Sequence, residues 1–301
     1  MTIARKQQIS LDHTPYYHCT TRCVRGAFLC GEDGRSGRNF DHRKQWLEDR
    51  LSLLSTVFAI DLLAYAIMSN HYHVVVRLHS AGTAGWSDEE VVERWGRVFT
   101  VPDHVTEELI DTWRQRLCDL SWYMRCLNES LARAANREDR CSGRFWEGRF
   151  HCQALLDEAA LLKCMAYVDL NPIRADIATT PETSAHTSVK ARIERRDDHL
   201  LQFADARRAV QHSIPIRKHE YLQLVDWSGR QIRHRKRGRI PEDLPSILER
   251  LDLSGKAWTD EMHHYGRWYY RAVGSLNKLQ HYCQHLGQRW LKGQSRTAAA
   301  Y

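Results

Sequence analysis

The sequence lacks the features that mark membrane, secreted and repeat proteins. No apolar run reaches the length of about 18 residues that a bilayer-spanning helix requires, and the residues after Met1 contain no apolar stretch typical of a signal peptide. No internal repeat or low-complexity tract stands out in the 301 residues. With 43% hydrophobic residues, the chain can bury a sizeable core. We therefore expect a globular cytoplasmic protein with no membrane partner.

Paired cysteines are also missing. The nine cysteines are scattered and none forms a Cys-x-x-Cys pair, so neither a disulfide framework nor a four-cysteine zinc site is indicated. Cys19, Cys23 and Cys30 form a loose cluster, but zinc-binding pairs usually lie about two to four residues apart. We expect these thiols to be reduced and buried.

Net positive charge is absent from the first part of the chain and concentrated in the last. Residues 1–180 contain 22 Lys and Arg against 24 Asp and Glu, whereas residues 181–301 contain 22 against 13, within a total net charge of +7. The excess charge that attracts a polyanion therefore lies in the C-terminal part. We predict two parts, a domain at 1–180 and a basic, mainly helical extension at 181–301.

The hydrophobic patterns of the first part predict an α+β fold. Helical or alternating spacing indicates, in chain order, a strand at 16–21, a helix at 41–55, strands at 57–68 and 71–78, a helix at 119–137, a strand at 144–153 and a helix at 157–172. This is the order of the ferredoxin-like plan, an antiparallel sheet with helices on one face. Residues 80–118 interrupt it as an insertion. In the extension, we predict helices at 197–211, 244–253 and 259–291.

His71 and His73 are the first candidate site residues. Side chains alternate along a strand, so both imidazoles point to the same face of the predicted strand 71–78 and can hold one ion. Taken alone, a His-x-His pair is more often two polar residues on a solvated face than a metal site. A catalytic site at this pair therefore requires further residues from another helix or strand.

Lys163, Tyr167 and Asn171 are the candidates for these further residues. They are spaced four apart and lie along one face of the predicted helix 157–172. A helical tyrosine ordinarily sits at the edge of a core, and Asn171 before Pro172 is compatible with a simple helix stop. The proline also leaves the direction of the Asn171 side chain open.

Three motifs together resemble the IS200-like transposases, in particular the tyrosine transposases associated with repetitive extragenic palindromes. They are AIMSNHYHVVV at 66–76, GRFWEGRF at 143–150 and AYVDLNPIRA at 166–175. The resemblance covers roughly residues 12–180. It identifies His71-Tyr-His73 as the His-hydrophobe-His (HUH) motif, Tyr167 as the nucleophile and Asn171 as the residue that completes the metal site.

The resemblance implies a metal-dependent endonuclease and strand transferase acting on single-stranded or hairpin DNA. Mg²⁺ or Mn²⁺ is the expected cofactor, since a divalent ion polarises phosphoryl oxygens. Attack by Tyr167 would give a 5′-phosphotyrosine and a free 3′-hydroxyl. The protein is expected to act as a monomer or a homodimer. Lys163, one turn earlier on the helix, is a candidate helper in proton transfer, although such a lysine is ordinarily solvated.

Further residues are candidates for DNA contacts. Aromatic rings stack on bases and cations meet phosphates in single-strand binding, but alternate residues of any strand must also pack in a core. A basic run at 230–239 holds six Arg or Lys residues. The candidates are Arg144, Trp146, Arg149, Arg174, Arg233, Arg235, Lys236, Arg237 and Arg239.

Two other classes compete with this interpretation. A domesticated DNA-binding protein or repressor would keep the fold without cutting, and a structural zinc protein would make Tyr167 incidental. The position of Tyr167 discriminates between them, because a nucleophile must face the same cavity as both imidazoles.

Overall fold

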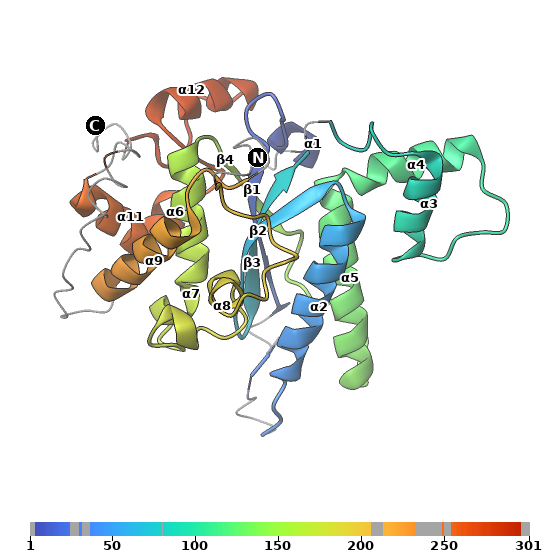
Figure 1. Ribbon diagram of the computed structural model, residues 1–301, viewed down its shortest axis with the longest axis horizontal. Helices are drawn as coiled ribbons and strands as arrows, with labels where there is room; N and C mark the ends of the chain where they lie inside the picture. Colours follow the sequence, from blue (N-terminus) through green and yellow to red (C-terminus); the bar gives the residue numbers. More distant parts are fainter. Residues whose placement is uncertain are drawn as a thin grey trace.

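The computed structural model describes residues 4–24, 30–31, 37–79, 81–205, 213–232, 249 and 254–295. Its five-stranded sheet has the order β2-β3-β1-β4-β5 (Figure 1), and the strands are β1 (Tyr16–Arg22), β2 (Ile60–Ile67), β3 (His71–Leu78), β4 (His151–Leu155) and β5 (Ala272–Val273). All neighbours are antiparallel except β4 and β5. The first four strands have the ferredoxin-like order, which confirms the predicted α+β class.

Helices make up most of the remaining described structure. Those before β4 are α1 (Arg5–Gln8), α2 (His42–Val57), α3 (Asp88–Gly96), α4 (Glu107–Leu117) and α5 (Leu120–Glu138). Those after it are α6 (Glu158–Asp169), α7 (Asn171–Arg174), the 3₁₀ turn η2 (Pro181–Thr183), α8 (Ser188–Ile193), α9 (Lys218–Ile232), α11 (Gly255–Trp268) and α12 (Leu276–His285).

Helices α2 and α5 cover one face of the sheet (Figure 1). Their apolar stripes, including Leu51 and Leu127, join Tyr72, Val74 and Val76 of β3 in one buried cluster. Asp119 fixes the start of α5, because its side chain accepts a hydrogen bond from the Trp122 amide. This is the helical layer that the sequence predicts.

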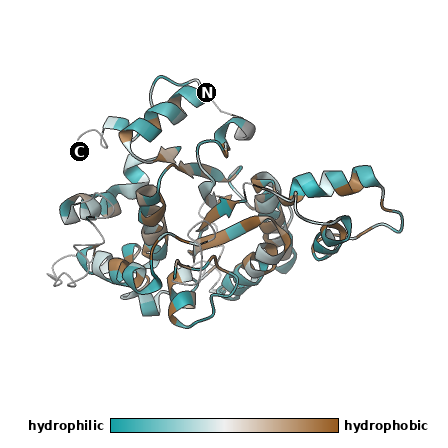
Figure 2. Cartoon of the chain, turned by 45° about the horizontal axis from the view of Figure 1, so that its top comes forward, coloured by the Kyte–Doolittle hydropathy of each residue, from teal (hydrophilic) through white to brown (hydrophobic). Residues whose placement is uncertain are grey.

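A second helical layer covers the opposite face, so helices do not lie on one face only. Val75 of β3 is buried there with residues of α6, α9 and α11, including Met165, Leu224 and Trp258. Side-chain alternation explains why Val75 belongs to this cluster and its neighbours to the other. Figure 2 shows the central strands coloured mainly as hydrophobic, as burial on both faces requires. The extension at 181–301 thus contributes to the core that α6 needs.

Strand β4 begins later than predicted. The sequence predicts a strand over 144–153, whereas regular pairing covers only His151–Leu155. Upstream, Trp146 makes an isolated bridge with Cys23, and its indole donates to the Asn128 carbonyl. The aromatic residues that favoured a strand therefore pack as an irregular segment. Strand β2 also begins later than predicted. The sequence predicts a strand from residue 57, but Val57 belongs to α2 and β2 begins at Ile60.

The three helices predicted in the extension agree with the structure to different degrees. The described part of 197–211 is not helical, since Phe203 instead makes a bridge with Ile214. Most of 244–253 lies outside the described residues. The range 259–291 divides into α11 and α12, which are separated by β5. Gly274 permits this break, because a Cβ there would lie 2.8 Å from the Leu156 Cβ.

The insertion forms an arm of two helices, α3 and α4, that extends away from the sheet (Figure 1). Ser87 caps α3 by accepting from the Glu90 amide. Trp95 stacks on Trp113 with ring centroids 5.2 Å apart and joins the arm to the α5 core. Within the described ranges, none of the helices has the length and apolarity to span a bilayer.

Candidate active site

His71 and His73 lie on the same face of β3, as predicted. Their ring centroids are 5.0 Å apart at an interplanar angle of 76°. Strand β1 runs beside them, with Thr20 opposite His73 and Arg22 opposite His71. The two imidazoles are therefore held by the centre of the sheet, where β3 is paired on both sides.

His73 is buried and is hydrogen-bonded through one nitrogen. Its Nδ1 lies 2.9 Å from the Nε2 of His18 and 3.1 Å from the Thr20 Oγ1. Its Nε2 is buried and has no hydrogen-bonding partner among the described residues. Such an atom is costly to bury unless something else satisfies it. A bound ligand would satisfy it.

His71 has the complementary arrangement. Its Nδ1 lies 2.6 Å from the Asn70 Oδ1, and an amide oxygen can only accept. The Nδ1 of neutral His71 therefore carries the proton, which leaves the lone pair on Nε2. A hydrogen bond of this kind commonly orients a metal-binding histidine.

Burial keeps the three histidines of this face neutral. It lowers the pKa of His71 to about 4, with the nearby positive charge of Arg22 adding to the effect. Burial likewise lowers the pKa of His18 to about 4. The pKa of His73 falls well below its usual value, because burial is reinforced by its histidine neighbours. Neutral imidazoles are the form that binds metal ions.

Tyr167 reaches this face from α6. Asp157 starts the helix, within the range predicted from the sequence, by accepting from the Ala160 amide at 2.8 Å. The Tyr167 ring meets His73 edge-on, with centroids 5.8 Å apart at 89°. On its other side, it stacks on Tyr265 of α11 at 4.6 Å. Tyr167 therefore lies on the same face of the sheet as His73, and its facing a cavity shared with both imidazoles stays a prediction.

Burial and nearby polar groups shift the pKa of the Tyr167 hydroxyl in opposite directions. Burial raises its pKa above the usual value, whereas the positive charge of Arg174, a hydrogen bond from Asn171 and the charge of Arg22 lower it. The Arg174 guanidinium lies 5.1 Å from the Tyr167 ring centroid. The positive charges of Arg174 and Arg22 favour a phenolate at Tyr167. The effect of burial is larger, so the pKa of Tyr167 stays raised.

Asn171 stays close to Tyr167. It begins α7, where its side-chain amide donates to the Tyr167 carbonyl at 3.2 Å and its exposed fraction is only 8%. Among the described residues, no hydrogen bond joins Asn171 to His71 or His73. Asn171 therefore lies beside Tyr167, and its role as a metal ligand stays a prediction.

Lys163 is not a free cation. Its Nζ lies 2.9 Å from the Glu261 Oε1 of α11, and both side chains are buried. The Glu261 Oε2 accepts a further bond from the Tyr269 hydroxyl at 3.2 Å. A lysine held in this way is part of the contact between α6 and α11, which does not favour the predicted helper role.

The candidate DNA contacts divide into exposed and occupied residues. Arg144 and Arg149 are exposed. Trp146 is buried and its ring packs edge-on against Tyr72, so it is not available to stack on a base. Arg174 donates to the carbonyls of Met262 and His263. The remaining candidates lie outside the described residues: Arg233, Arg235, Lys236, Arg237 and Arg239.

The donor set at this face fits a divalent ion. No group of three or more His, Cys, Asp or Glu side chains in the described part of the chain has the arrangement of a metal site. The fit rests instead on two neutral imidazoles and the partnerless Nε2 of His73, with the carboxamide of Asn171 beside Tyr167 as the predicted third donor. Nitrogen and carboxamide donors with open positions suit an ion that also binds substrate oxygen.

Four residues of the site were not predicted from the sequence. His18 and Arg22 lie on the same face of β1 as Thr20, and Gln153 lies opposite His18 on β4. Strand alternation predicts that His18, Thr20 and Arg22 point the same way. The pairing of β1 with β3, which brings them to the histidines, has no local signal.

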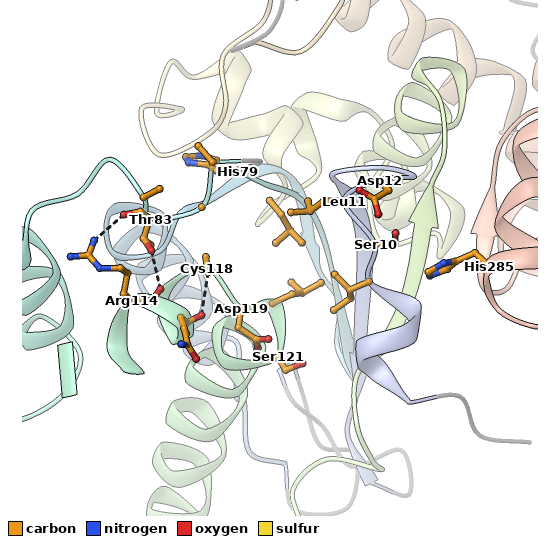
Figure 3. A pocket seen from close by; sticks show the side chains of 17 residues that line it. Ser10, Leu11, Asp12, His79, Thr83, Arg114, Cys118, Asp119, Ser121 and His285 are labelled. Atoms are coloured by element: carbon orange, nitrogen blue, oxygen red, sulfur yellow. Dashed lines mark hydrogen bonds between the residues drawn. The ribbon is translucent and has the colours of Figure 1, made fainter. Parts of the chain in front are cut away.

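A well-defined cavity lies elsewhere (Figure 3). It has a volume of about 870 Å³ and is lined by the segment 9–12, the end of β3, the segment after it and the start of α5. His79 and Arg114 are among its lining residues. Strands rise about 3.3 Å per residue, so the five residues from His73 to Leu78 separate the two places by roughly 16 Å. The cavity is not part of the candidate site.

The comparisons with known proteins yield one structural likeness. No family model and no curated protein matches the chain. Among solved structures, the chain is similar to a REP-associated tyrosine transposase bound to a REP hairpin. The TM-score is 0.41 at 11% sequence identity, and the match covers 72% of this chain and 99% of that chain.

Proposed function

We propose that this protein is a metal-dependent endonuclease and strand transferase that cuts single-stranded DNA at hairpin-forming sequences, with Tyr167 as its nucleophile. The observation that carries the proposal is the edge-on contact between Tyr167 and His73, whose buried Nε2 has no partner among the described residues. Two elements far apart in the sequence thereby supply a nucleophile and a ligand to one place. The motif resemblance at 66–76 and 166–175 supports the same assignment.

His71 and His73 would hold the divalent ion, with Asn171 as the third donor. When bound, Mg²⁺ or Mn²⁺ would polarise the phosphoryl oxygens of the scissile bond. Burial keeps the pKa of His71 near 4, so its imidazole is in the metal-binding form throughout the neutral range.

The hydroxyl of Tyr167 performs the cut. Its oxygen bonds to phosphorus as the bond from phosphorus to the 3′-oxygen breaks, and the phenol gives up its proton. A 5′-phosphotyrosine and a free 3′-hydroxyl result. The phosphodiester energy is kept in the new bond, so another 3′-hydroxyl can reverse the step and join a different strand. Arg174 and Arg22 favour this step, because their charges stabilise the phenolate.

A second candidate function is DNA binding without cutting on the same fold. It is favoured by the contact of Tyr167 with α11, where a Cβ at Gly266 would lie 2.9 Å from the Tyr167 hydroxyl. A nucleophile packed this closely needs room for a phosphate. Strand cleavage decides between the two functions.

The experiment incubates the full chain with labelled hairpin DNA carrying single-stranded flanks, in the presence of Mn²⁺ or Mg²⁺, and looks for a covalent adduct on a denaturing gel. We expect an adduct with the wild type and none with Tyr167→Phe. His71→Ala should bind the DNA but fail to cut it. Retained DNA binding with no adduct from the wild type would favour the non-cutting function.

A further inference from the structure

A chain of buried hydrogen bonds connects the C-terminal segment to His73. It starts at the Tyr270 carbonyl, which accepts from the Gln153 Nε2 at 3.3 Å. It continues from the Gln153 Oε1 to the His18 Nδ1 at 3.3 Å and from the His18 Nε2 to the His73 Nδ1 at 2.9 Å. Gln153, His18 and His73 are exposed by 5% or less.

The direction of this chain is fixed at its C-terminal end. A backbone carbonyl only accepts, so the amide nitrogen of Gln153 must face Tyr270 and its oxygen must face His18. The Tyr265 hydroxyl, 3.2 Å from the same oxygen, reinforces this orientation by donating to it. Rotating the amide would place two acceptors against each other.

The remaining protons follow from that orientation. The Gln153 oxygen can only accept, so the Nδ1 of neutral His18 carries its proton and the Nε2 accepts. The His73 Nδ1 must then donate, which leaves the lone pair of His73 on Nε2. Thr20 does not disturb this order, because its hydroxyl can accept from His73 and donate to His18 at 3.4 Å.

We propose that His18 and Gln153, held by Tyr265 and Tyr270 of the C-terminal segment, are positioning residues that fix His73 as the Nδ1-protonated tautomer and aim its Nε2 lone pair at the ion. The inference deepens the proposed function and rests on it for the identity of the ligand. It assigns a role to part of the extension. Residues 265–270 orient His73, a candidate ligand that lies almost two hundred positions earlier in the sequence.

The tautomer can be measured without metal. The experiment labels the full chain with ¹⁵N-histidine, records long-range ¹H–¹⁵N correlations in the presence of EDTA and assigns His73 by its loss in His73→Gln. We expect a protonated Nδ1 and an unprotonated Nε2. A protonated Nε2 on His73 in the wild type would overturn the proposal, whatever the activity of the protein.

Metal affinity provides the second readout. Mn²⁺ alone is titrated into each variant and free Mn²⁺ is followed by electron paramagnetic resonance. Loss of a hydrogen bond behind a ligand typically weakens metal binding by about 10-fold to 100-fold, so we expect this loss for His18→Phe. His18→Gln keeps an acceptor for His73 and should recover most of the affinity. His13→Phe, the same exchange at a histidine near Tyr282, is the matched control.

The outcomes separate the inference from the proposed function. Unchanged Mn²⁺ affinity in a folded His18→Phe would contradict the inference, even if the wild type forms the DNA adduct. If the wild type forms no adduct but shows the expected tautomer and affinity order, the positioning role stands and the cutting function fails. Equal losses in His18→Phe and His18→Gln would contradict the role of the hydrogen bond.

Discussion

The imidazole of His73 and the phenol ring of Tyr167 meet edge-on with centroids 5.8 Å apart. The contact depends on the packing of α6 against β2 and β3, where Val75 and Met165 share one core. It also depends on α11, because Tyr265 stacks on the other face of Tyr167. Tyr167 is therefore held between the sheet and the C-terminal segment.

The first prediction concerns this packing of Tyr167. Gly266→Ala should favour the helix α11 by up to about 1 kcal/mol, since alanine is the better helix former. The new Cβ would lie 2.9 Å from the Tyr167 hydroxyl, so the phenol must move. Because misplacement by about 1 Å can reduce a rate about 100-fold, we expect adduct formation to fall at least tenfold while thermal stability is kept. Gly85→Ala is the control, as its Cβ would meet nothing within 4 Å.

The second prediction concerns the residue that orients His71. Asn70→Ala removes the acceptor of the 2.6 Å bond from the His71 Nδ1. We expect Mn²⁺ affinity to fall by about 10-fold to 100-fold, as measured by isothermal titration calorimetry. Asn70→Asp keeps an acceptor and should lose much less. Equal affinity in Asn70→Ala and the wild type would show that the hydrogen bond does not orient a ligand.

The third prediction is a pH dependence of stability without metal. Burial lowers the pKa of His18 from 6.5 to about 4, so between these values the unfolded chain binds a proton that the folded chain does not. Stability therefore falls as the pH drops through this window, by up to about 3 kcal/mol from His18 alone. Urea unfolding at several pH values should show a shallower fall for His18→Gln. The same slope in both proteins would refute the contribution of His18.

The fourth prediction concerns the buried pair of Lys163 and Glu261. Glu261→Gln leaves the Lys163 ammonium buried without its counter-charge, which should cost about 3 kcal/mol in urea unfolding. Adding Lys163→Met to Glu261→Gln removes the orphaned charge and should restore part of the loss. A Glu261→Gln protein as stable as the wild type would contradict the structural role of the pair.

The same double variant tests the helper role predicted for Lys163. If Lys163 mainly joins α6 to α11, the folded double variant should still form the DNA adduct. Loss of the adduct in a folded protein would assign proton transfer to Lys163 instead.

Local sequence patterns were sufficient to predict the framework of the site. Alternation places His71 and His73 on one face of β3, and the N-cap Asp157 fixes the start of α6 and hence the direction of Tyr167. Both features depend on neighbours within a few residues. The strand order followed from the element order, because few topologies satisfy it.

The rest of the site depends on contacts between distant segments. The register of β1 against β3 brings His18 to His73, and no residue of either strand encodes that register locally. Trp146 was expected in a strand, but the bridge to Cys23 and the bond to Asn128 bury it. Likewise, β5 has only two residues, which is too short for a periodic signal.

The most direct test of the account identifies the residue that carries the DNA. The wild-type protein is incubated with hairpin DNA and Mn²⁺, the DNA is trimmed with nuclease, and the protease-digested chain is analysed by mass spectrometry. The account predicts a nucleotide on the peptide that contains Tyr167, lost in Tyr167→Phe and in His73→Ala. A nucleotide on another residue, or an adduct that persists in Tyr167→Phe, would contradict it.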